Sequence, residues 1–413
     1  MLGFEVLRKL TPPQRNAFLA AFLGWTLDAF DYFVLVFVMK DIAAEFHVSE
    51  HAVAYALMLT LACRPIGALL FGMAADRYGR RIPLMVNIVC YSAINLVCGF
   101  SPNLTVLFVL RALFGIAMGG EWGLGASLAM ETIPPESRGF LSGLLQEGYS
   151  TGYLLAAVAY GLVFPVLGWR WMFFIGALPA LLSLFIRTKV QESPAWEEEN
   201  RRRKSAAGEG RPRVPLALGP IVRQHGRLFL YLVVLMTAFT FMSHGSQDVY
   251  PTFLQKQHHY KPGVVSSIAI IYNVGALLGG MYFGGLSQRV GRRRAIMTAA
   301  LLALPIIPLW AFSHSIASFA LGGFLMQFMV QGAWGIIPAH LSELSPNIVR
   351  GTFTGLAYQL GNLLSSANAP LQTYWAARLH GNYAVVMSIV MTIVLLSVAI
   401  VTGLGKEARD VRF

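Results

Sequence analysis

Long apolar blocks dominate the chain, and each is about as long as a membrane-spanning helix. A helix rises about 1.5 Å per residue, so roughly 20 apolar residues cross a hydrocarbon core of about 30 Å. The apolar runs are continuous and do not alternate, which excludes a transmembrane β-barrel and leaves helices as the spanning structure. The pattern predicts twelve helices, at residues 16–39, 52–75, 82–100, 104–130, 140–164, 168–187, 227–250, 263–287, 295–312, 316–341, 352–376 and 382–404.

One long polar stretch, residues 188–226, interrupts the apolar blocks. It contains PAWEEENRRRKSAAGEGRPRVP, whose charge, glycine and proline are typical of a linker with short amphipathic pieces. Six predicted helices lie on each side of it. We therefore expect an all-α membrane protein with an N-terminal six-helix bundle over 1–187, a cytosolic linker over 188–226 and a C-terminal six-helix bundle over 227–413.

The two halves repeat at a constant offset. GMAADRYGRR at residues 72–81 joins the second and third predicted helices, and GGLSQRVGRR at residues 284–293 joins the eighth and ninth. Glu131 is followed by an Arg-Gly pair at residues 138–139, and Glu343 is followed at the same spacing by an Arg-Gly pair at residues 350–351. Both pairs are 212 positions apart, which indicates a duplicated six-helix unit of the kind found in secondary transporters.

Composition agrees with a membrane protein. The 413 residues are 56% hydrophobic and 13% charged, whereas about 25% of residues are charged in soluble domains. The N-terminal apolar block is too long for a cleavable signal peptide and contains two aspartates. Cys63, Cys90 and Cys98 all fall inside apolar blocks, so we expect buried thiols with no disulfide framework and no metal site.

The net charge of +12 is distributed as a membrane topology requires. With the N-terminus inside, most Lys and Arg residues lie on inner segments, which follows the positive-inside rule and gives no reason to expect nucleic-acid binding. The outer segments hold Lys40, Arg170, Lys256, Lys261 and Arg378. We expect a multi-pass protein of the cell inner membrane with both termini in the cytoplasm.

The loop G-x-x-x-D-R-x-G-R-R at residues 72–81 resembles the signature loop of the major facilitator superfamily. Its second copy departs from that pattern because Gln288 replaces the acid. We expect a cytoplasmic latch in which Asp76 caps a neighbouring helix and the arginines pair with acids or helix C-termini of the other bundle. For Arg80 and Arg81 the alternative is simple positive-inside anchoring. The latch candidates are Asp76, Arg77, Gly79, Arg80, Arg81, Arg289 and Arg292.

Arg64 lies near the middle of the second predicted helix. Charge at this depth costs at least about 2.5 kcal/mol, so it indicates function unless it is neutralised. A guanidinium offers a planar fork of donors that fits a carboxylate, which predicts substrate contact. The alternative is a permanent internal ion pair with Asp28, Asp31 or Glu121. Arg111, nearer the outer end of its helix, is expected to be structural.

Several acids within the apolar blocks are candidates for carrying a proton. Asp28 and Asp31 are three residues apart on one helix face, and two neighbouring carboxylates in a low dielectric cannot both ionise cheaply. Glu121 is flanked by glycines that allow close helix contact, and it could carry a proton or neutralise a cation. The proton-coupling candidates are Asp28, Asp31, Glu121, Glu147 and Asp248.

The seventh and eleventh predicted helices are unusually polar. Residues 243–252 read SHGSQDVYPT and residues 358–362 read YQLGN. Adding the offset of 212 to the positions of the acids in the first and fifth predicted helices gives polar residues of the seventh and eleventh. Glu147, for example, corresponds to Gln359. Four helices therefore present polar groups to one axis, which predicts a cavity.

The string S-H-x-S-Q-D-x-x-x-T resembles the seventh-helix signature of fungal lactate/pyruvate–proton symporters, within the wider sialate/monocarboxylate–proton symporter family. The segment QLGN and the embedded Arg64 are similar to that family, whereas Thr240 stands where the family pattern has Asn. The resemblance implies proton-coupled uptake of short monocarboxylates. It implies that substrate binds near Arg64, Ser243, His244, Gln247, Asp248, Gln359 and Asn362.

We therefore expect a secondary active transporter that works by alternating access, with a small organic acid, a proton and the lipid bilayer as its partners. We expect a monomer that is not an enzyme and needs no cofactor. One alternative is a symporter for sialic acid or another larger acid, which many aromatic residues around the cavity would favour. A second alternative is a nutrient receptor that binds without transport, but such receptors usually have long cytosolic tails and the predicted tails here are short. Export of apolar drugs is disfavoured because such an exporter would not need an arginine in its cavity.

Overall fold

The computed structural model describes residues 5–208, 218–409 and 411, and helical segments occupy every one of the twelve predicted ranges. The first half contains α1 (Glu5–Lys9), α2 (Pro12–Glu45), α3 (Glu50–Tyr78), α4 (Arg81–Cys98), α5 (Leu104–Met118), α6 (Glu121–Thr132), η1 (Pro135–Ser137), α7 (Arg138–Gln146), α8 (Gly148–Leu167), α9 (Trp169–Ile175) and α10 (Ala180–Lys189). The second contains α12 (Leu218–Gln247), α13 (Tyr250–Lys256), α14 (Pro262–Val290), α15 (Arg292–Ala303), η2 (Leu304–Ile306), α16 (Ile307–Ala311), α17 (Ile316–Trp334), α18 (Ile337–Leu344), η3 (Asn347–Val349), α19 (Arg350–Ser365), α20 (Asn368–Arg378) and α21 (Tyr383–Leu404).

The predicted polar stretch is more helical than its composition suggests. Its first part forms α11 (Pro194–Gly208), which extends away from the helix bundles, and the exposed pair Arg202–Glu198 at 3.1 Å links one turn of it. At its other end, α12 begins at Leu218 and not near the predicted residue 227. Residues 209–217 of the predicted linker lie outside the described residues.

Several of the predicted helices are interrupted, and three interruptions coincide with acids. The fourth predicted helix divides at Gly119–Gly120, so that Glu121 begins α6. The fifth divides at Glu147, between α7 and α8. The seventh divides after α12, beside Asp248. Broken helices at the bilayer midplane are typical of ion and substrate sites in transporters.

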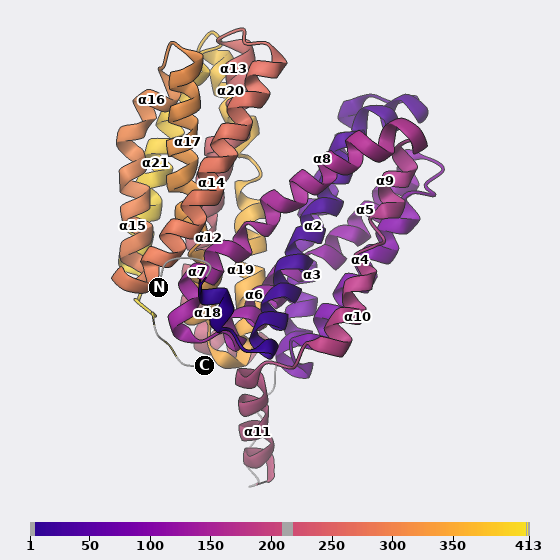
Figure 1. Ribbon diagram of the computed structural model, residues 1–413, viewed down its shortest axis with the longest axis vertical. Coiled ribbons are helices and arrows are strands. Elements are labelled where there is room, and N and C mark those ends of the chain that lie inside the picture. The colour runs from indigo at the N-terminus through magenta and orange to yellow at the C-terminus, as the bar shows by residue number, and fades with distance from the viewer. Residues whose placement is uncertain (1–4, 209–217, 410, 412–413) are drawn as a thin grey trace.

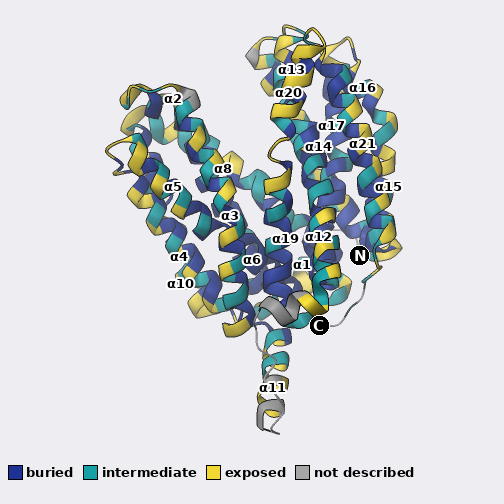
Figure 2. Cartoon of the chain, turned by 180° about the vertical axis from the view of Figure 1, so that it is seen from behind, coloured by how far each residue is buried: buried dark blue, intermediate teal, exposed yellow. Residues whose placement is uncertain are grey.

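The helices form two groups that meet at one end of the molecule. Helices α2–α10 pack mainly with one another, as do α12–α21. Two apolar cores lie within the first group, and the core of the second group also includes Trp25 and Trp122 of the first. The groups contact each other where α19 packs on α3 and α6, and where α14 packs on α7. These contacts lie toward the end that also carries α11, here called the terminal end, and the groups diverge toward the opposite end (Figures 1 and 2).

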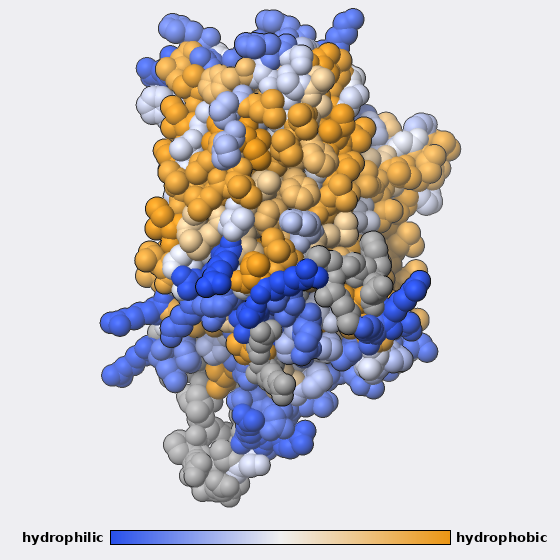
Figure 3. Space-filling view, turned by 60° about the vertical axis from the view of Figure 1, so that its left-hand side comes forward, coloured by the Kyte–Doolittle hydropathy of each residue, from blue (hydrophilic) through white to orange (hydrophobic). Residues whose placement is uncertain are grey.

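The outer surface is suited to lipid. Large apolar side chains such as Leu162, Val166, Leu181 and Ile270 are exposed on the outside of the groups. A broad hydrophobic belt lies between polar bands at the two ends of the molecule (Figure 3). Eleven of the described helical segments are long and apolar enough to span a membrane, and the more polar pair α19–α20 occupies the remaining predicted span.

Candidate functional site

Arg64 forms a buried ion pair with Asp28. α3 carries the arginine beside Pro65 and α2 carries the aspartate, and 2.9 Å separates Nη2 of Arg64 from Oδ2 of Asp28. The Arg64 side chain is 7% exposed and the Asp28 side chain is fully buried. Oδ1 of Asp28 and Nε of Arg64 have no hydrogen-bond partner among the described residues, so the pair retains capacity to bind another polar group.

Asp31 belongs to a different network from Asp28, although both lie on α2. Oδ1 of Asp31 accepts a hydrogen bond of 3.0 Å from the amide of Asn95. Arg111 donates to Thr60 Oγ1 at 3.2 Å and to Asn95 Oδ1 at 3.4 Å, and its guanidinium lies 4.1 Å from the ring centroid of Phe114. Arg111 therefore joins α3, α4 and α5 within one half, which fits the structural role predicted for it.

Glu121 is fully buried inside the first half. Neither carboxyl oxygen has a hydrogen-bond partner among the described residues, and the side chain packs against Gly24 of α2. An ionised carboxylate without a cation or donors would be very costly here, so this environment favours the neutral acid. Glu147 is 5% exposed, and among the described residues its carboxyl accepts one hydrogen bond, from Ser150 Oγ at 3.4 Å.

The polar string of the seventh predicted helix presents two pairs of side chains. His244 Nδ1 and Asp248 Oδ2 are 3.0 Å apart, and both side chains are about one-third exposed. Ser243 Oγ accepts hydrogen bonds from the amides of Gln247 at 3.2 Å and Gln331 at 3.3 Å. The first pair is thus accessible to solvent, while the second joins α12 to α17.

The polar residues of α19 lie next to α12. Asn362 donates to Gln359 Oε1 at 3.3 Å, and Nε2 of Gln359 is buried without a partner among the described residues. Thr240 Oγ1, at the position where the resembling family has Asn, donates to the carbonyl oxygen of Gly361 at 2.9 Å. Thr240 therefore holds α12 against α19.

Tyrosines connect the two sides of the candidate site. Tyr32 of α2 and Tyr149 of α8 lie within electrostatic range of both Arg64 and Asp248, which come from different halves. Tyr358 of α19 lies within the same range of Arg64. The structure therefore places the cation of the first half and the polar string of the second about one shared region.

An aromatic cluster next to this region was not identified from the sequence. Tyr358 stacks on Trp122 with 4.4 Å between ring centroids and lies edge-on to Trp25 and Trp334. Trp25 also stacks on Tyr149 at 5.7 Å. The cluster crosses between the halves, and only the tertiary packing of five helices brings these rings together.

At the terminal end, Asp76 joins the first half to the second. Its carboxylate accepts hydrogen bonds from the backbone N–H of Gly351 at 2.9 Å and of Thr352 at 3.0 Å, and from Thr352 Oγ1 at 2.7 Å. Arg80 donates to the same carboxylate at 2.8 Å. A carboxylate at the N-terminus of α19 satisfies free N–H groups and lies at the positive end of the helix dipole.

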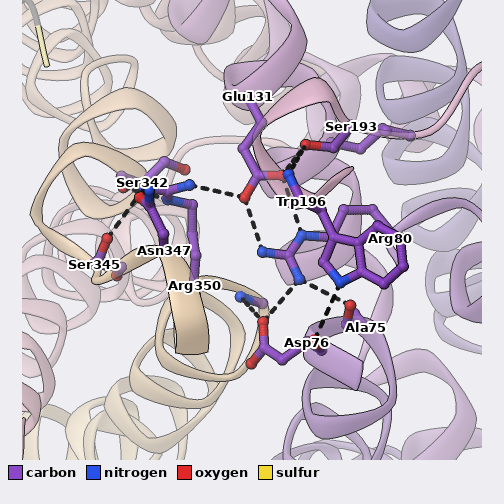
Figure 4. A network of polar contacts seen from close by, with 12 residues as sticks. Ala75, Asp76, Arg80, Glu131, Ser193, Trp196, Ser342, Ser345, Asn347 and Arg350 are labelled. Atoms are coloured by element: carbon purple, nitrogen blue, oxygen red, sulfur yellow. Dashed lines mark hydrogen bonds and ion pairs between the residues drawn. The ribbon is translucent and has the colours of Figure 1, made fainter. Parts of the chain in front are cut away.

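Glu131 is the centre of the same network. Arg80 binds it through two hydrogen bonds of 2.9 and 3.2 Å, and Arg350 of the second half donates to it at 3.0 Å. Ser193 Oγ donates to it as well (Figure 4). Burial opposes the positive charge of Arg80, but Glu131 and Asp76 outweigh burial and raise the pKa of its guanidinium.

The second copy of the motif builds a related, weaker contact. Arg292 binds Glu343 through hydrogen bonds of 2.9 and 3.0 Å, and Arg138 of the first half lies 4.0 Å from the same carboxylate. Gln288 Oε1 accepts hydrogen bonds from the N–H of Gly139 at 3.2 Å and from Arg292 at 2.9 Å, whereas the Asp76 carboxylate accepts three from the equivalent helix start. Replacing the acid by an amide therefore leaves the α14–α7 side with a neutral cap.

The arginines of the repeated motif differ from the prediction. Arg80 and Arg292 pair with glutamates of their own halves, because the short loop after α3 or α14 turns each side chain back onto its own group. Arg81 likewise bonds the carbonyl oxygen of Arg187. The pairing between halves comes from Arg350 and Arg138, which belong to the internal repeat but are not among the predicted latch residues.

The remaining latch candidates have other surroundings. Arg77 is exposed and lies over the Tyr78 ring, and the backbone carbonyl of Arg289 accepts a hydrogen bond from Arg409. Gly79 ends α3 with a φ of 98°, which favours glycine. A Cβ there would also meet Glu192.

Two glutamates cap the loops after α3 and α14. The sequence does not indicate them, because they lie far along the chain from these loops. Glu192 accepts hydrogen bonds from the N–H groups of Arg80 and Arg81, and burial raises the pKa of its carboxyl against those bonds. Glu407 accepts them from the N–H groups of Arg292 and Arg293. An acid after the last helix of each half is the pattern that could have indicated them. In residues 5–208 and 218–409, no group of three His, Cys, Asp or Glu side chains could hold a metal ion.

The structure has two groups of spanning helices around a shared polar region, which is the arrangement of a membrane transporter. The chain belongs to the major facilitator superfamily, whose family model matches residues 21–261 and 241–411. The resemblance predicted from the sequence is therefore confirmed at the level of the superfamily, and the chain is a transporter and not an enzyme.

Several characterised proteins are similar to it. A carboxylic acid transporter protein homolog of Saccharomyces cerevisiae is 30% identical over 388 residues, which is 90% of this chain but 63% of the yeast protein. The sialic acid transporter NanX of Escherichia coli is 28% identical over 406 residues, or 97% of this chain and 96% of NanX. The solved structure of the proton:xylose symporter XylE has a TM-score of 0.75 at 20% identity and covers 96% of this chain and 97% of that one, which shows the shared fold.

Proposed function

We propose that the protein is a proton-coupled symporter that takes up small organic acids by alternating access. The observation that carries the proposal is the buried Arg64–Asp28 pair, which lies in the region shared with the polar string of α12. A mid-membrane arginine whose counter-ion is an aspartate is a site where an incoming carboxylate can replace a resident one.

The exchange of carboxylates gives a mechanism for coupling. When a substrate carboxylate binds Arg64, Asp28 loses its cation in a buried environment, and taking up a proton removes the resulting uncompensated charge. Substrate and proton are then bound together, and their charges cancel before the halves move. Asp28 is the coupling residue of this scheme, while Gln247, Gln359, Asn362 and the His244–Asp248 pair orient the substrate.

The substrate class follows from the arginine and from the relatives. The names of the similar proteins include carboxylic acid, sialic acid, niacin and cis,cis-muconate, and each of these is or contains a carboxylic acid. Within this class we propose short monocarboxylates such as lactate or pyruvate, on the motif in α12 and the segment QLGN. The cluster of Trp25, Trp122 and Tyr358 favours a second candidate, a larger or planar acid that packs against aromatic rings.

The terminal end is proposed to face the cytosol, in an inner membrane with both chain ends inside. Basic residues of the repeated motifs lie at this end, as the positive-inside rule requires. The two proposed bundles, residues 1–187 and 227–413, are in contact there and diverge at the other end. On this assignment the structure is the outward-facing state, and uptake requires the contacts at the terminal end to open.

The test is uptake into proteoliposomes of labelled lactate, pyruvate, niacin, muconate and sialic acid, with and without an inward proton gradient. We expect at least one carboxylate to accumulate when protons flow inward, and accumulation to vanish when pH is equal on both sides and no membrane potential exists. Uphill accumulation that needs sodium would contradict proton coupling. Transport of none of these acids would contradict the substrate class.

A further inference from the structure

The contact between α7 and α14 is a ladder of three rungs. Residues 139, 143 and 147 follow one another at helical spacing on the first half, and residues 288, 284 and 280 face them on the second. Gly139 donates to Gln288, and Gly143 packs so closely on Gly280 and Gly284 that a Cβ would meet backbone atoms. The first two rungs therefore hold the backbones of the two halves in direct contact.

Glu147 is the third rung. A Cβ on Gly280 would meet Oε1 of Glu147, so the carboxyl lies directly on the backbone of α14 in the other half. The side chain is 5% exposed and has a single weak contact with Ser150 on its own helix. The described ion pairs include none to Glu147. A buried carboxyl in this position is stable only when it is neutral.

The pseudo-symmetric ladder has no acid at the equivalent place. Gly351 and Gly355 of α19 correspond to Gly139 and Gly143, and the third rung is Gln359. Gln359 is likewise buried, with its Nε2 unpaired. One ladder thus ends in a permanently neutral amide and the other in a group that is neutral only while it holds a proton.

We propose that Glu147 is a proton site that controls the contact between the halves: it is protonated while the α7–α14 ladder is closed and loses its proton when the ladder opens. The proposal rests on the proposed alternating-access function and adds a control by pH to it. Opening exposes the carboxyl to the aqueous phase, where the ionised form is solvated and the proton leaves to water. Closing the ladder again requires the proton to return to the same carboxyl.

Linkage gives the direction of the effect. A proton that binds only the closed state favours that state, so the closed population falls as pH rises. For one proton the ratio of open to closed molecules rises by up to about tenfold per pH unit. On the proposed sidedness, an acidic cytosol therefore keeps the transporter closed to the inside and slows further acid uptake.

The groups that surround Glu147 would not by themselves make the closed population depend on pH. α14 presents Gly280, α17 presents the backbone of Gln331, and the neighbouring Tyr149 stacks on Trp25. The acids of the terminal network, including Glu131 and Glu343, are held by arginines. Glu136 of η1, just before α7 in the same half, is exposed to water, which makes it the control.

The experiment measures the opening of the ladder without any substrate. Spin labels are attached to cysteines at Tyr78 and Val290, the exposed last residues of α3 and α14, in a full-length protein whose Cys63, Cys90 and Cys98 are replaced by alanine. Double electron–electron resonance in nanodiscs then gives the label–label distance distribution over a series of pH values. The variants are Glu147→Gln, Glu147→Asp and Glu136→Gln.

We expect the parent protein to shift from the short to the long distance as pH rises. Glu147→Gln should hold the short distance at every pH, Glu147→Asp should retain a pH response, and Glu136→Gln should respond as the parent does. A pH response of Glu147→Gln equal to that of the parent would overturn the proposal, as would the loss of the response in Glu136→Gln alone. Because no substrate is present, these outcomes do not depend on whether organic acids are transported.

Discussion

Asp28 and Arg64 are neutralised by each other at the centre of the first half, with 2.9 Å between carboxylate and guanidinium. α2 and α3 hold them there although each charge alone would be unstable in the membrane. Arg64 thus forms the internal ion pair that is the alternative to substrate contact. Arg64 can still bind substrate, because a substrate carboxylate can replace the carboxylate of Asp28.

Replacing Arg64 should separate substrate binding from folding. Arg64→Gln should abolish carboxylate binding, whereas Arg64→Lys keeps the charge but loses the bidentate fork, and should weaken binding by about 1–3 kcal/mol. Ligand-induced thermal stabilisation of the purified variants measures both effects. The control is Arg64→Gln combined with Asp28→Asn, which removes the unpaired acid. We expect the double variant to regain stability but not binding, and recovered binding would show that Arg64 is purely structural.

Asp76→Asn should slow turnover and leave substrate affinity nearly unchanged. The substitution removes the charge that caps α19, where the carboxylate accepts three hydrogen bonds from Gly351 and Thr352. Each charge-assisted bond contributes about 1.5–3 kcal/mol, so the closed state at the terminal end should become less populated. Equilibrium binding and transport on one preparation separate the effects, with exposed Arg77→Gln as the control. Lost binding with normal turnover would refute a role for Asp76 in the conformational cycle.

Glu131→Gln should destabilise the protein strongly. Glu131 accepts from Arg80 and Arg350, both almost fully buried, and its loss leaves two cations with an uncompensated charge. Breaking a buried pair in this way costs about 3–5 kcal/mol. Glu45→Gln is the control, since Glu45 and Arg170 form an ion pair whose side chains are 46% and 34% exposed, and such pairs contribute about 0–1 kcal/mol. Thermal unfolding in detergent compares the two, and equal melting temperatures would contradict the central role of Glu131.

Gly143→Ala should weaken the closed contact between the halves. Its new Cβ would meet the carbonyl oxygen of Gly280, and backbone on both sides leaves little room to relax. Gly161→Ala is the matched control in the next helical segment, where a Cβ meets nothing within 4 Å and should be neutral or slightly stabilising. Accessibility of a cysteine at Tyr78 or Val290 to a water-soluble reagent measures opening at the terminal end. Unchanged accessibility in Gly143→Ala would show that the tight glycine contact does not hold the halves together.

The sequence determined the class, the spans and the internal duplication of this protein. Apolar blocks of membrane length leave the backbone no option but helices, and a constant offset of 212 is visible without any structure. The same reasoning placed Arg64, Asp28 and the polar string of α12 on spanning helices, because an ionisable group within an apolar block is conspicuous on its own.

The tertiary structure decided which of these groups are partners. Asp28 and Asp31 are three residues apart on one helix, yet one contacts Arg64 and the other Asn95, a choice made by the packing of α3 and α4. Arg80 binds Glu131, 51 positions along the chain, and Asp76 caps a helix of the other half. Hydrogen bonds and ion pairs act over a few ångströms in space, whereas sequence patterns record only neighbours along the chain. The pairing of charges between and within the halves therefore became visible only when the two groups of helices were packed together.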